Sequence, residues 1–530
     1  MRSIPLRLWF LVALSALLQL LPFPLAGPVP AWRRLFCWFC LVPLLWALLQ
    51  GKDRSGRSLK PSQTAWLGYF CGFLWYMGNC YWIYQTMHLY GGIPKPASFG
   101  ILVLFSLYVG LYHALFGWLL GWIRQLNSVQ LSLAVSPFLW VAVELARARI
   151  TGFPWDLMGY TQVDFPGLSQ LAPWTGVMGI SFLVAGVNAL LLAAPVTQNK
   201  KKAWIGVSVA VVVLLVAINR FGNVVIERQL DGRAVLLQEN LSVGAEGVNP
   251  RENKQQMLSS FDALSIHPQA GRPMDADNPP LIIWPEAPAD FIDTDPAFRQ
   301  SMSELAAKTR SPVIVNSVGF ASLNPNGRYN LHNSASFFRP DGSYAGHYDK
   351  MHLVPFGEYT PYKPLFFFVG HLLDDLPFIP GERRTMLEDH GQHLGVFICY
   401  ESIFGDEIRR FVGDGASVLV NISDDGWYGD TSAPWEHLDM VKMRAIENHR
   451  WILRSTNTGV TAVIDPEGRI EDQLPRHVRS SLGVYFGHNY DLTFYTRHGD
   501  WFAWLCALVS AGALLYGVAR GRFAKPAEVH

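Results

Sequence analysis

The apolar residues of this chain gather in blocks at its two ends, and this distribution constrains the fold more than any other feature. Half of the 530 residues are hydrophobic and only 16% are charged, which is the balance of a membrane protein. Between the blocks, residues 233–500 read as an ordinary globular domain. The sequence therefore predicts a membrane domain joined to a domain that folds in water.

Eight apolar segments approach the length of a membrane span, which is roughly 17 to 25 residues. They lie at 8–25, 34–50, 65–83, 99–123, 131–146, 174–196, 203–219 and 501–519. The first has the basic start of a signal peptide, but the spans that follow it favour an anchor. We expect a multi-pass helical membrane domain of about eight helices, with seven in residues 1–220, a globular domain in 221–499, and the last helix and a tail in 500–530.

Basic residues predict the direction of the spans. The loops that would share a side with both termini hold more Lys and Arg than the opposite loops, and they include Lys200, Lys201 and Lys202. The positive-inside rule then places both termini in the cytoplasm and the globular domain on the other side of the membrane. The formal net charge of +1 gives no argument for a nucleic-acid partner.

Strand-like and helix-like runs alternate in the globular domain, which indicates an α/β fold with a sheet covered by helices. The predicted helices are 297–310, 403–410 and 433–449. The predicted strands are 234–238, 281–286, 313–316, 393–399, 417–422 and 452–455, with hairpins over 334–348 and 461–470.

Three reactive side chains stand where predicted strands end. Cys399 is the only cysteine between residues 220 and 500, and Glu286 and Lys350 follow strand-like runs upstream. A lone cysteine is usually a small buried hydrophobic residue, and a charge at a strand end is usually solvated. Together, however, a thiol, a carboxylate that accepts its proton and a cation that holds the resulting charge are what acyl transfer at cysteine requires.

These motifs support a resemblance. The runs WPE at 284–286, KMHLVPFGE at 350–358 and ICYES at 398–402 resemble the Glu-Lys-Cys motifs of the carbon-nitrogen hydrolase (nitrilase) superfamily. With TGFPW at 151–155 and RSTN at 454–457, the chain is most similar to a membrane branch of it, the bacterial apolipoprotein N-acyltransferases. The likeness runs over nearly the whole chain. It implies an α-β-β-α sandwich for the globular domain and a place in the bacterial inner membrane, with that domain in the periplasm.

The resemblance also implies a reaction in two halves. Cys399, with Glu286 as the base, would attack an ester of a phospholipid, for which phosphatidylethanolamine is expected, and form a thioester. The acyl chain would then pass to the N-terminal S-diacylglyceryl cysteine of an apolipoprotein. Lys350 and the backbone N–H of Tyr400 are expected to hold the oxyanion, and Glu358 to orient Lys350.

Three further residues are candidates for substrate contacts, and no cofactor is expected. Glu401 is a candidate for positioning the acceptor. Trp155 and Trp427 are candidates for substrate binding, although tryptophans are common at membrane interfaces in any case. The histidines form no metal-binding pattern, so no metal site is predicted.

Two other functions remain open from the residues alone. A membrane-bound amidase or nitrilase would hydrolyse the same thioester with water, and a lipid transporter would use the spans without chemistry. The spans hold few charges, with Glu144 as the main exception, which speaks against transport. The chain departs from the family pattern at Asp424, where relatives usually have Asn, and in the loop at 242–250, which lacks a Trp.

Overall fold

The computed structural model describes residues 3–196, 206, 216, 229–243, 254–271, 279–286, 291–323, 327–359, 378–389 and 391–523. The chain divides into two compact units. The helical unit consists of Met1–Val225, Asp430–Asp439 and His498–His530, and the sheet unit consists of Ile226–Gly429 and Met440–Arg497.

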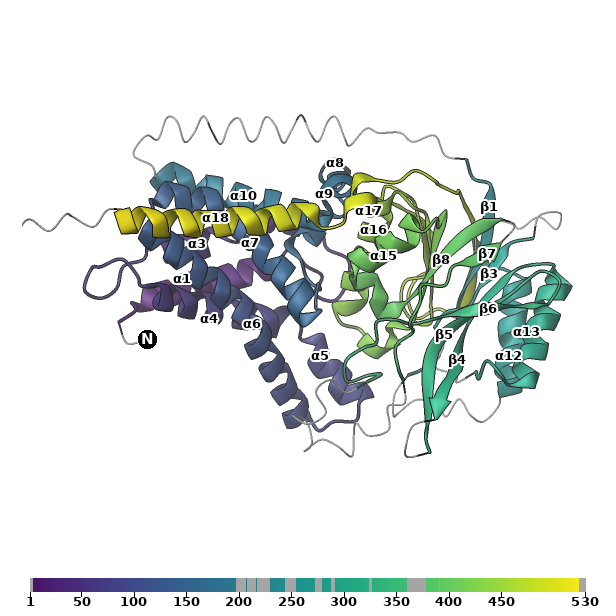
Figure 1. Cartoon of the computed structure of the whole chain (residues 1–530). Coiled ribbons are helices and arrows are strands. Elements are labelled where there is room, and N and C mark those ends of the chain that lie inside the picture. The colour runs from purple at the N-terminus through teal and green to yellow at the C-terminus, as the bar shows by residue number, and fades with distance from the viewer. Residues whose placement is uncertain are drawn as a thin grey trace, which may run out of the picture. The chain divides into compact units, whose positions relative to one another are not determined.

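The helical unit is built from apolar helices that follow most of the predicted spans (Figure 1). Its longer helices are α1 (Leu6–Leu20), α3 (Val42–Gln50), α4 (Pro61–Asn79), α6 (Lys95–Leu126), α7 (Val129–Ala146), α10 (Val177–Val196) and α18 (Trp501–Phe523). Within the described residues, five helical stretches are long and apolar enough to cross a membrane: Ala31–Gln50, Lys95–Leu126, Val129–Thr151, Val177–Val196 and Trp501–Arg520. The predicted span at 203–219 lies outside the described residues, apart from two isolated positions.

Helices α4 and α6 pack closely because glycines line their contact. A Cβ atom on Gly68 would lie 2.3 Å from the carbonyl oxygen of His113, and one on Gly117 would lie 2.4 Å from that of Thr64. Any larger side chain would push the backbones apart. Close approach through small residues is how helices associate in lipid, where there is no hydrophobic driving force between them.

Glu144, the charged residue expected near the end of a span, ties a loop to its own helix. Its Oε1 accepts hydrogen bonds from the Trp140 indole at 3.0 Å and from the backbone N–H of Met158 at 2.9 Å. A carboxylate engaged in this way stabilises the fold of the helical unit, which accounts for its presence without an ion pathway.

Two sheets make up the centre of the sheet unit. One has seven strands in the order β2-β13-β1-β3-β4-β5-β6, and the other has six in the order β12-β11-β10-β9-β8-β7. The strands of the first are β1 (Gly232–Gln238), β2 (Ala270–Gly271), β3 (Leu281–Ile283), β4 (Val313–Leu323), β5 (Tyr329–Phe338), β6 (Tyr344–Asp349) and β13 (Ser480–Phe486). Those of the second are β7 (Leu387–Asp389), β8 (Gln392–Ile398), β9 (Val418–Ser423), β10 (Ile452–Thr456), β11 (Ala462–Ile464) and β12 (Ile470–Gln473).

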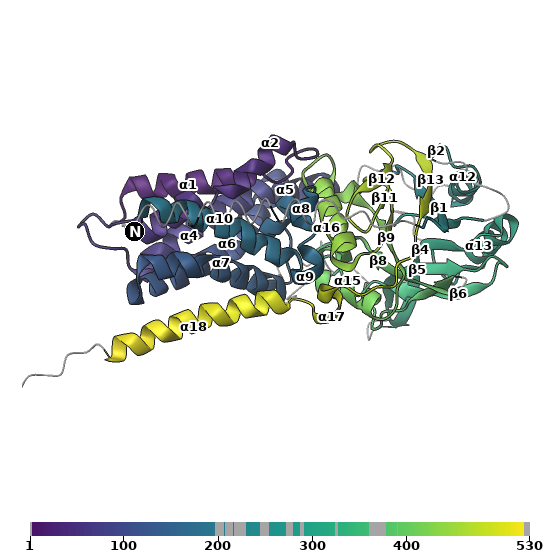
Figure 2. The same ribbon diagram turned by 90° about the horizontal axis from the view of Figure 1, so that it is seen from above.

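The sheets form the two inner layers of a four-layer sandwich. Helices α12 (Lys254–Ile266) and α13 (Pro296–Thr309) cover the first sheet, and α15 (Gly405–Gly413) and α16 (Ala433–Asn448) cover the second (Figure 2). The hydroxyl of Ser455 on β10 joins the sheets by donating to the carbonyl oxygens of Leu237, at 2.7 Å, and Ile283, at 3.1 Å. The predicted α-β-β-α sandwich is therefore present.

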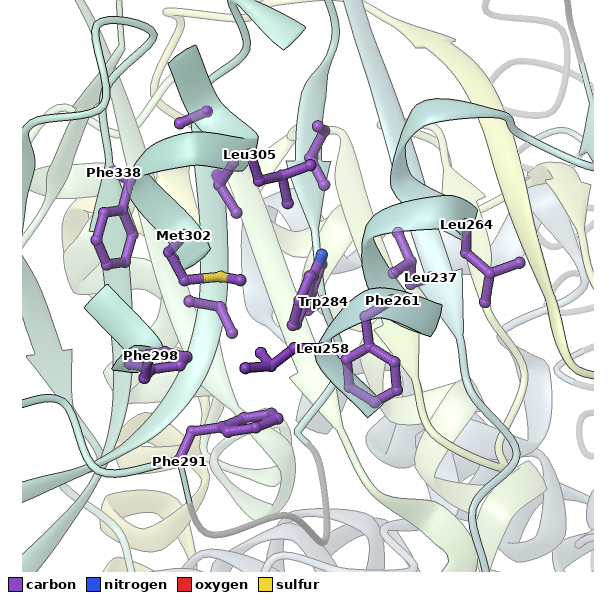
Figure 3. Close-up of a cluster of buried hydrophobic side chains, with 14 of the residues drawn as sticks. Leu237, Leu258, Phe261, Leu264, Trp284, Phe291, Phe298, Met302, Leu305 and Phe338 are labelled. Atoms are coloured by element: carbon purple, nitrogen blue, oxygen red, sulfur yellow. The ribbon is translucent and has the colours of Figure 1, made fainter. Parts of the chain in front are cut away.

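A buried apolar cluster fixes the outer helices on the first sheet. Trp284 lies at its centre, between Phe298 and Met302 from α13 and Phe261 and Leu264 from α12 (Figure 3). The rings of Trp284 and Phe261 meet edge to face with their centroids 4.8 Å apart. The Trp284 indole N–H donates to the Ser265 hydroxyl at 2.9 Å, so its one polar atom is satisfied. This cluster holds the strand that leads to Glu286.

Each predicted strand and helix of the globular domain has a counterpart, and most ends differ by a few residues, but β4 extends seven residues beyond the predicted end at residue 316. Helices α12 and α17 (Phe494–His498), strand β13 and the short strands β2 and β7 were not predicted. Strand β13 completes the first sheet by pairing antiparallel with β1, from Gly232 opposite Phe486 to Gln238 opposite Ser480. Its sequence carries two serines and a glycine, which weaken the strand signal.

Replacement of Trp284 by Ala should destabilise the sheet unit by about 3–5 kcal/mol, because it opens a cavity in the cluster and leaves Ser265 without its donor. Thermal unfolding of the detergent-purified chain, followed by near-UV circular dichroism, would measure the loss as a lower Tm. Trp427→Ala is the matched control, since Trp427 is 45% exposed. Equal losses for the two variants would contradict the assigned role of the cluster.

Candidate active site

Glu286, Lys350 and Cys399 each follow the carboxyl end of a strand. Glu286 comes after β3, Lys350 directly after β6, and Cys399 directly after β8. Strand β4 is parallel to β3, and β5 is antiparallel to both β4 and β6. Strand β6 therefore runs in the same direction as β3. The ends of β3 and β6 lie at one edge of the first sheet, which is why Glu286 and Lys350 meet although 64 positions separate them, whereas Cys399 follows β8 of the second sheet.

The backbone of Cys399 is held in the left-handed region, with φ of +50°. A residue with a Cβ rarely adopts this conformation, and the strain persists only where the surroundings impose it. Here a strand passes abruptly into the 3-10 turn Cys399–Ile403. The turn sets the thiol at the strand end, in a conformation typical of nucleophiles carried on a sharp turn.

Lys350 is enclosed between two carboxylates. Its Nζ lies 3.3 Å from Glu286 Oε1 and 2.9 Å from Glu358 Oε1, and its side chain is 1% exposed. Burial by itself lowers the pKa of Lys350, but the charges of Glu286 and then Glu358 outweigh burial and raise the pKa above its ordinary value. The residue therefore stays a cation, with Glu358 at hydrogen-bonding distance from its ammonium group.

Asn333, which the sequence analysis missed, bridges the same two carboxylates. Its Nδ2 donates to Glu286 Oε1 and to Glu358 Oε1, each at 2.8 Å. Its own Oδ1 accepts from Asn316 Nδ2 on β4, also at 2.8 Å, which fixes the orientation of the amide. Asn333 lies inside β5, where alternating polar residues are typical of an ordinary solvent-facing side, so no local pattern distinguishes it from its neighbours.

The second oxygen of Glu286 has a different partner. The backbone N–H of Asp424, just after β9, donates to Oε2 at 3.0 Å. Three donors thus hold the Glu286 carboxylate: Asn333, Lys350 and the Asp424 backbone. These hydrogen bonds fix the orientation of the Glu286 carboxylate, so it can accept a proton from a neighbouring thiol in a defined geometry.

The thiol of Cys399 is protonated at rest. Burial, and next the charge of Glu286, raise the pKa of Cys399 well above its ordinary value, although Lys350 acts in the opposite direction. Such a thiol needs a base at the moment of attack, in contrast to cysteines that rest as thiolates. Glu286 and Lys350 are the charged neighbours with the largest influence on it.

Glu401 has an internal role that differs from the predicted one. Its Oε1 accepts from the Tyr348 hydroxyl at 2.7 Å and from the N–H groups of Met351 and His352 at 2.7 and 3.1 Å. Its Oε2 accepts from the N–H of Ile398 at 2.7 Å. The carboxylate is buried and fully engaged, so it joins the segment around Lys350 to the turn of Cys399 instead of facing an acceptor.

The other predicted contact residues lie in different surroundings. Tyr400 is buried beside Cys399, and Trp427 is 45% exposed in the 3-10 turn Asp425–Tyr428. Trp155, a candidate for substrate binding, belongs to the helical unit and is fully buried there. Its indole donates to Glu436 Oε2 at 2.7 Å and its ring packs on Trp82, with the centroids 5.1 Å apart.

The site combines a thiol, a fixed carboxylate and an enclosed ammonium, which can support attack on a carbonyl and stabilise the oxyanion that forms. In the part of the chain that the structure describes, no group of three or more His, Cys, Asp or Glu side chains is placed to hold a metal ion.

Comparison with known proteins identifies the two parts of the chain. Residues 4–190 match the apolipoprotein N-acyltransferase N-terminal domain, and residues 276–480 match the carbon-nitrogen hydrolase family. The apolipoprotein N-acyltransferase of Geobacter metallireducens is 33% identical over 519 residues, covering 96% of this chain and 95% of that protein. The chain belongs to the apolipoprotein N-acyltransferase family. The predicted family, fold class and enzyme class, an acyltransferase, are confirmed.

Other relatives agree in extent. The family member from Methylococcus capsulatus is 33% identical over 501 residues, covering 92% of each chain. Among solved structures, an amidase from Nesterenkonia sp. is 18% identical, covers 51% of this chain and 95% of its own, and has a TM-score of 0.35. These family members match nearly the whole chain, so the similarity includes both the helical unit and the sheet unit.

Asn333→Ala should slow the formation of an acyl-enzyme about tenfold to a hundredfold, because two carboxylates each lose a hydrogen bond in a buried setting. Single-turnover acylation followed by intact-protein mass spectrometry would measure the rate. Asn330→Ala is the matched control on the same strand, since its amide contacts only the exposed Ser322 among the hydrogen bonds described. Equal rates for the two variants would remove Asn333 from the site.

Proposed function

We propose that this protein transfers an acyl chain from a phospholipid to the N-terminal S-diacylglyceryl cysteine of an apolipoprotein, the last step in maturing a lipoprotein. The observation that carries the proposal is the enclosed Lys350 ammonium between Glu286 and Glu358, beside a strained cysteine in a chain with membrane-spanning helices. Glu286, Lys350 and Cys399 are the proposed catalytic residues.

In the first half-reaction, Glu286 takes the proton of the Cys399 thiol while the sulfur attacks an ester carbonyl of the lipid. The tetrahedral intermediate carries an oxyanion, which Lys350 and the backbone N–H of Tyr400 stabilise. When the intermediate collapses, the C–O bond of the ester breaks, and Glu286 gives its proton to the glycerol oxygen of the departing lysophospholipid. Cys399 then holds the acyl chain as a thioester.

In the second half-reaction, the α-amine of the acceptor attacks the thioester carbonyl. Glu286 takes a proton from the nitrogen, the oxyanion forms in the same place, and the C–S bond breaks. The proton then passes to the Cys399 sulfur, which restores the thiol. One base therefore serves both halves, because each needs a proton taken from the nucleophile and returned to the leaving group.

A membrane domain gives a physical reason for a lipid donor. The ester of a diacyl lipid lies near the polar surface of the bilayer, so its tails need an apolar environment while the ester reacts. Phosphatidylethanolamine is the proposed donor. The proposed location is the bacterial inner membrane, with both termini in the cytoplasm and the sheet unit in the periplasm, where exported apolipoproteins arrive.

Incubation of the purified chain with phosphatidylethanolamine, without acceptor, should add the mass of one acyl chain to Cys399. Cys399→Ser should lose turnover entirely, since a hydroxyl is far less acidic than a thiol, and Glu286→Gln and Lys350→Ala should prevent the adduct from accumulating. Peptide mass spectrometry would locate the adduct.

Cys506→Ser is the matched control, because Cys506 is buried in an apolar helix and has no part in the proposed chemistry. Lipoprotein N-acylation at an undiminished rate by Cys399→Ser would exclude Cys399 as the nucleophile. The rate at which the adduct disappears can be compared with and without an amine acceptor. Equal rates would mean that water removes the acyl chain and would favour a hydrolase.

The proposed orientation predicts the activity of topology reporters. Alkaline phosphatase, which is active only in the periplasm, should be active when inserted within residues 268–280 and inactive when fused after residue 530. Cell fractions assayed for phosphatase activity and for fusion abundance would measure both. The reverse pattern would place the sheet unit in the cytoplasm and exclude a reaction on exported lipoproteins.

A further inference from the structure

Asp424 contacts the proposed base through its backbone, and its own carboxyl group is buried beside that contact. The N–H of Asp424 donates to Glu286 Oε2 at 3.0 Å, and the Asp424 residue is 2% exposed. Its Oδ1 accepts from the N–H of Gly426 at 3.0 Å and from Asn457 Nδ2 at 3.2 Å. Its Oδ2 is buried and has no hydrogen-bond partner in the described part of the chain.

An ionised carboxylate is costly in such a position. One oxygen has two neutral donors, but the other lacks any donor, and no cation among the described ion pairs lies within 4.0 Å of Asp424. Arg454 pairs with the neighbouring Asp425 at 2.5 Å, and Lys350 pairs with Glu286 and Glu358. In the protonated form of Asp424, the buried Oδ2 carries a proton and the side chain has no net charge.

The charged groups around Asp424 act in the same direction. Burial, then the charge of Glu286, raise the pKa of Asp424 well above its ordinary value, while the donors Gly426 and Asn457 oppose this and the charge of Asp425 adds to it. Two carboxyl groups so close together do not readily ionise at once.

We propose that Asp424 is a positioning residue whose neutral, protonated form keeps Glu286 able to take the thiol proton. In that form Asp424 orients Glu286 through its N–H without adding a second negative charge. Loss of the Asp424 proton would set that charge beside Glu286, whose charge, with that of Asp425, already disfavours the thiolate of Cys399.

The proton balance of the first half-reaction stays as proposed. The S–H bond of Cys399 breaks and an O–H bond forms on Glu286, while Asp424 keeps its own proton throughout. The inference rests on the proposed function, because it needs acyl-enzyme formation at Cys399 with Glu286 as the base. It adds that this step requires one more protonated carboxyl group and therefore fails when the pH rises far enough to ionise it.

The pH dependence of the first half-reaction tests this inference. Acylation of the full-length protein by phosphatidylethanolamine in mixed micelles, without acceptor, would be followed by intact-protein mass spectrometry across the pH range in which the protein stays folded. The rate of the unmodified protein should fall about tenfold per pH unit above the pKa of Asp424, as loss of one proton requires. In Asp424→Asn the same alkaline fall should be absent, with rates within about twofold across that range.

Two further variants keep the test decisive. Asp424→Ser also cannot ionise, and its hydroxyl can still accept from the Gly426 N–H, so it replaces the Asn variant if that variant does not fold. Asp341→Asn, in an exposed turn, is the matched control and should keep the pH profile of the unmodified protein. Infrared difference spectra between the unmodified protein and a folded Asp424 variant should contain the carbonyl stretch of a protonated acid at neutral pH.

The outcomes separate the inference from the proposed function. Superimposable profiles for the unmodified protein and the Asp424 variants, or a spectrum that assigns a carboxylate to Asp424 at neutral pH, would overturn the inference and leave the acyl-enzyme intact. If the unmodified protein forms no adduct at any pH, the proposed function fails instead. An alkaline fall that disappears only in the Asp424 variants supports the inference.

Discussion

The buried ammonium of Lys350 is the charge around which the candidate site is organised. Two carboxylates can stand close together in a buried setting only when a cation and hydrogen-bond donors compensate them, and here Lys350 and Asn333 contact both Glu286 and Glu358. Removing the cation would leave two uncompensated carboxylates, which typically costs about 3–5 kcal/mol. The same ion pairs that keep Glu286 in place therefore join the end of β3 to the segment after β6, and the hydrogen bonds of Asn333 add β5 of the same sheet.

The sequence predicted most of the architecture because its signals are local. Apolar length indicated the membrane spans, alternating strands and helices indicated the sandwich, and reactive residues at the ends of strands indicated the site. Strand β13 escaped because pairing with β1 stabilises it more than its own composition does. A residue or strand whose role depends on a partner far along the chain has only a weak pattern in its own local sequence.

Asn333 and Glu401 illustrate the same limit within the site. Asn333 looks like one polar residue among several on β5, and only the folded sheet brings it between two carboxylates. Glu401 stands beside the nucleophile in the sequence, which suggested a substrate contact. Its burial and its four donors, which give it a structural task, depend on the fold of a segment about 50 residues upstream.

The position of Glu401 has a consequence for how the site opens. Backbone amides exchange their hydrogens with solvent when the bonds that protect them break, and groups that share a partner are released in the same event. The N–H groups of Met351, His352 and Ile398 all depend on this one carboxylate. We therefore expect the segment beside Lys350 and the strand end before Cys399 to open together. When the hydrogen bonds to Glu401 break, both segments lose their positions at once.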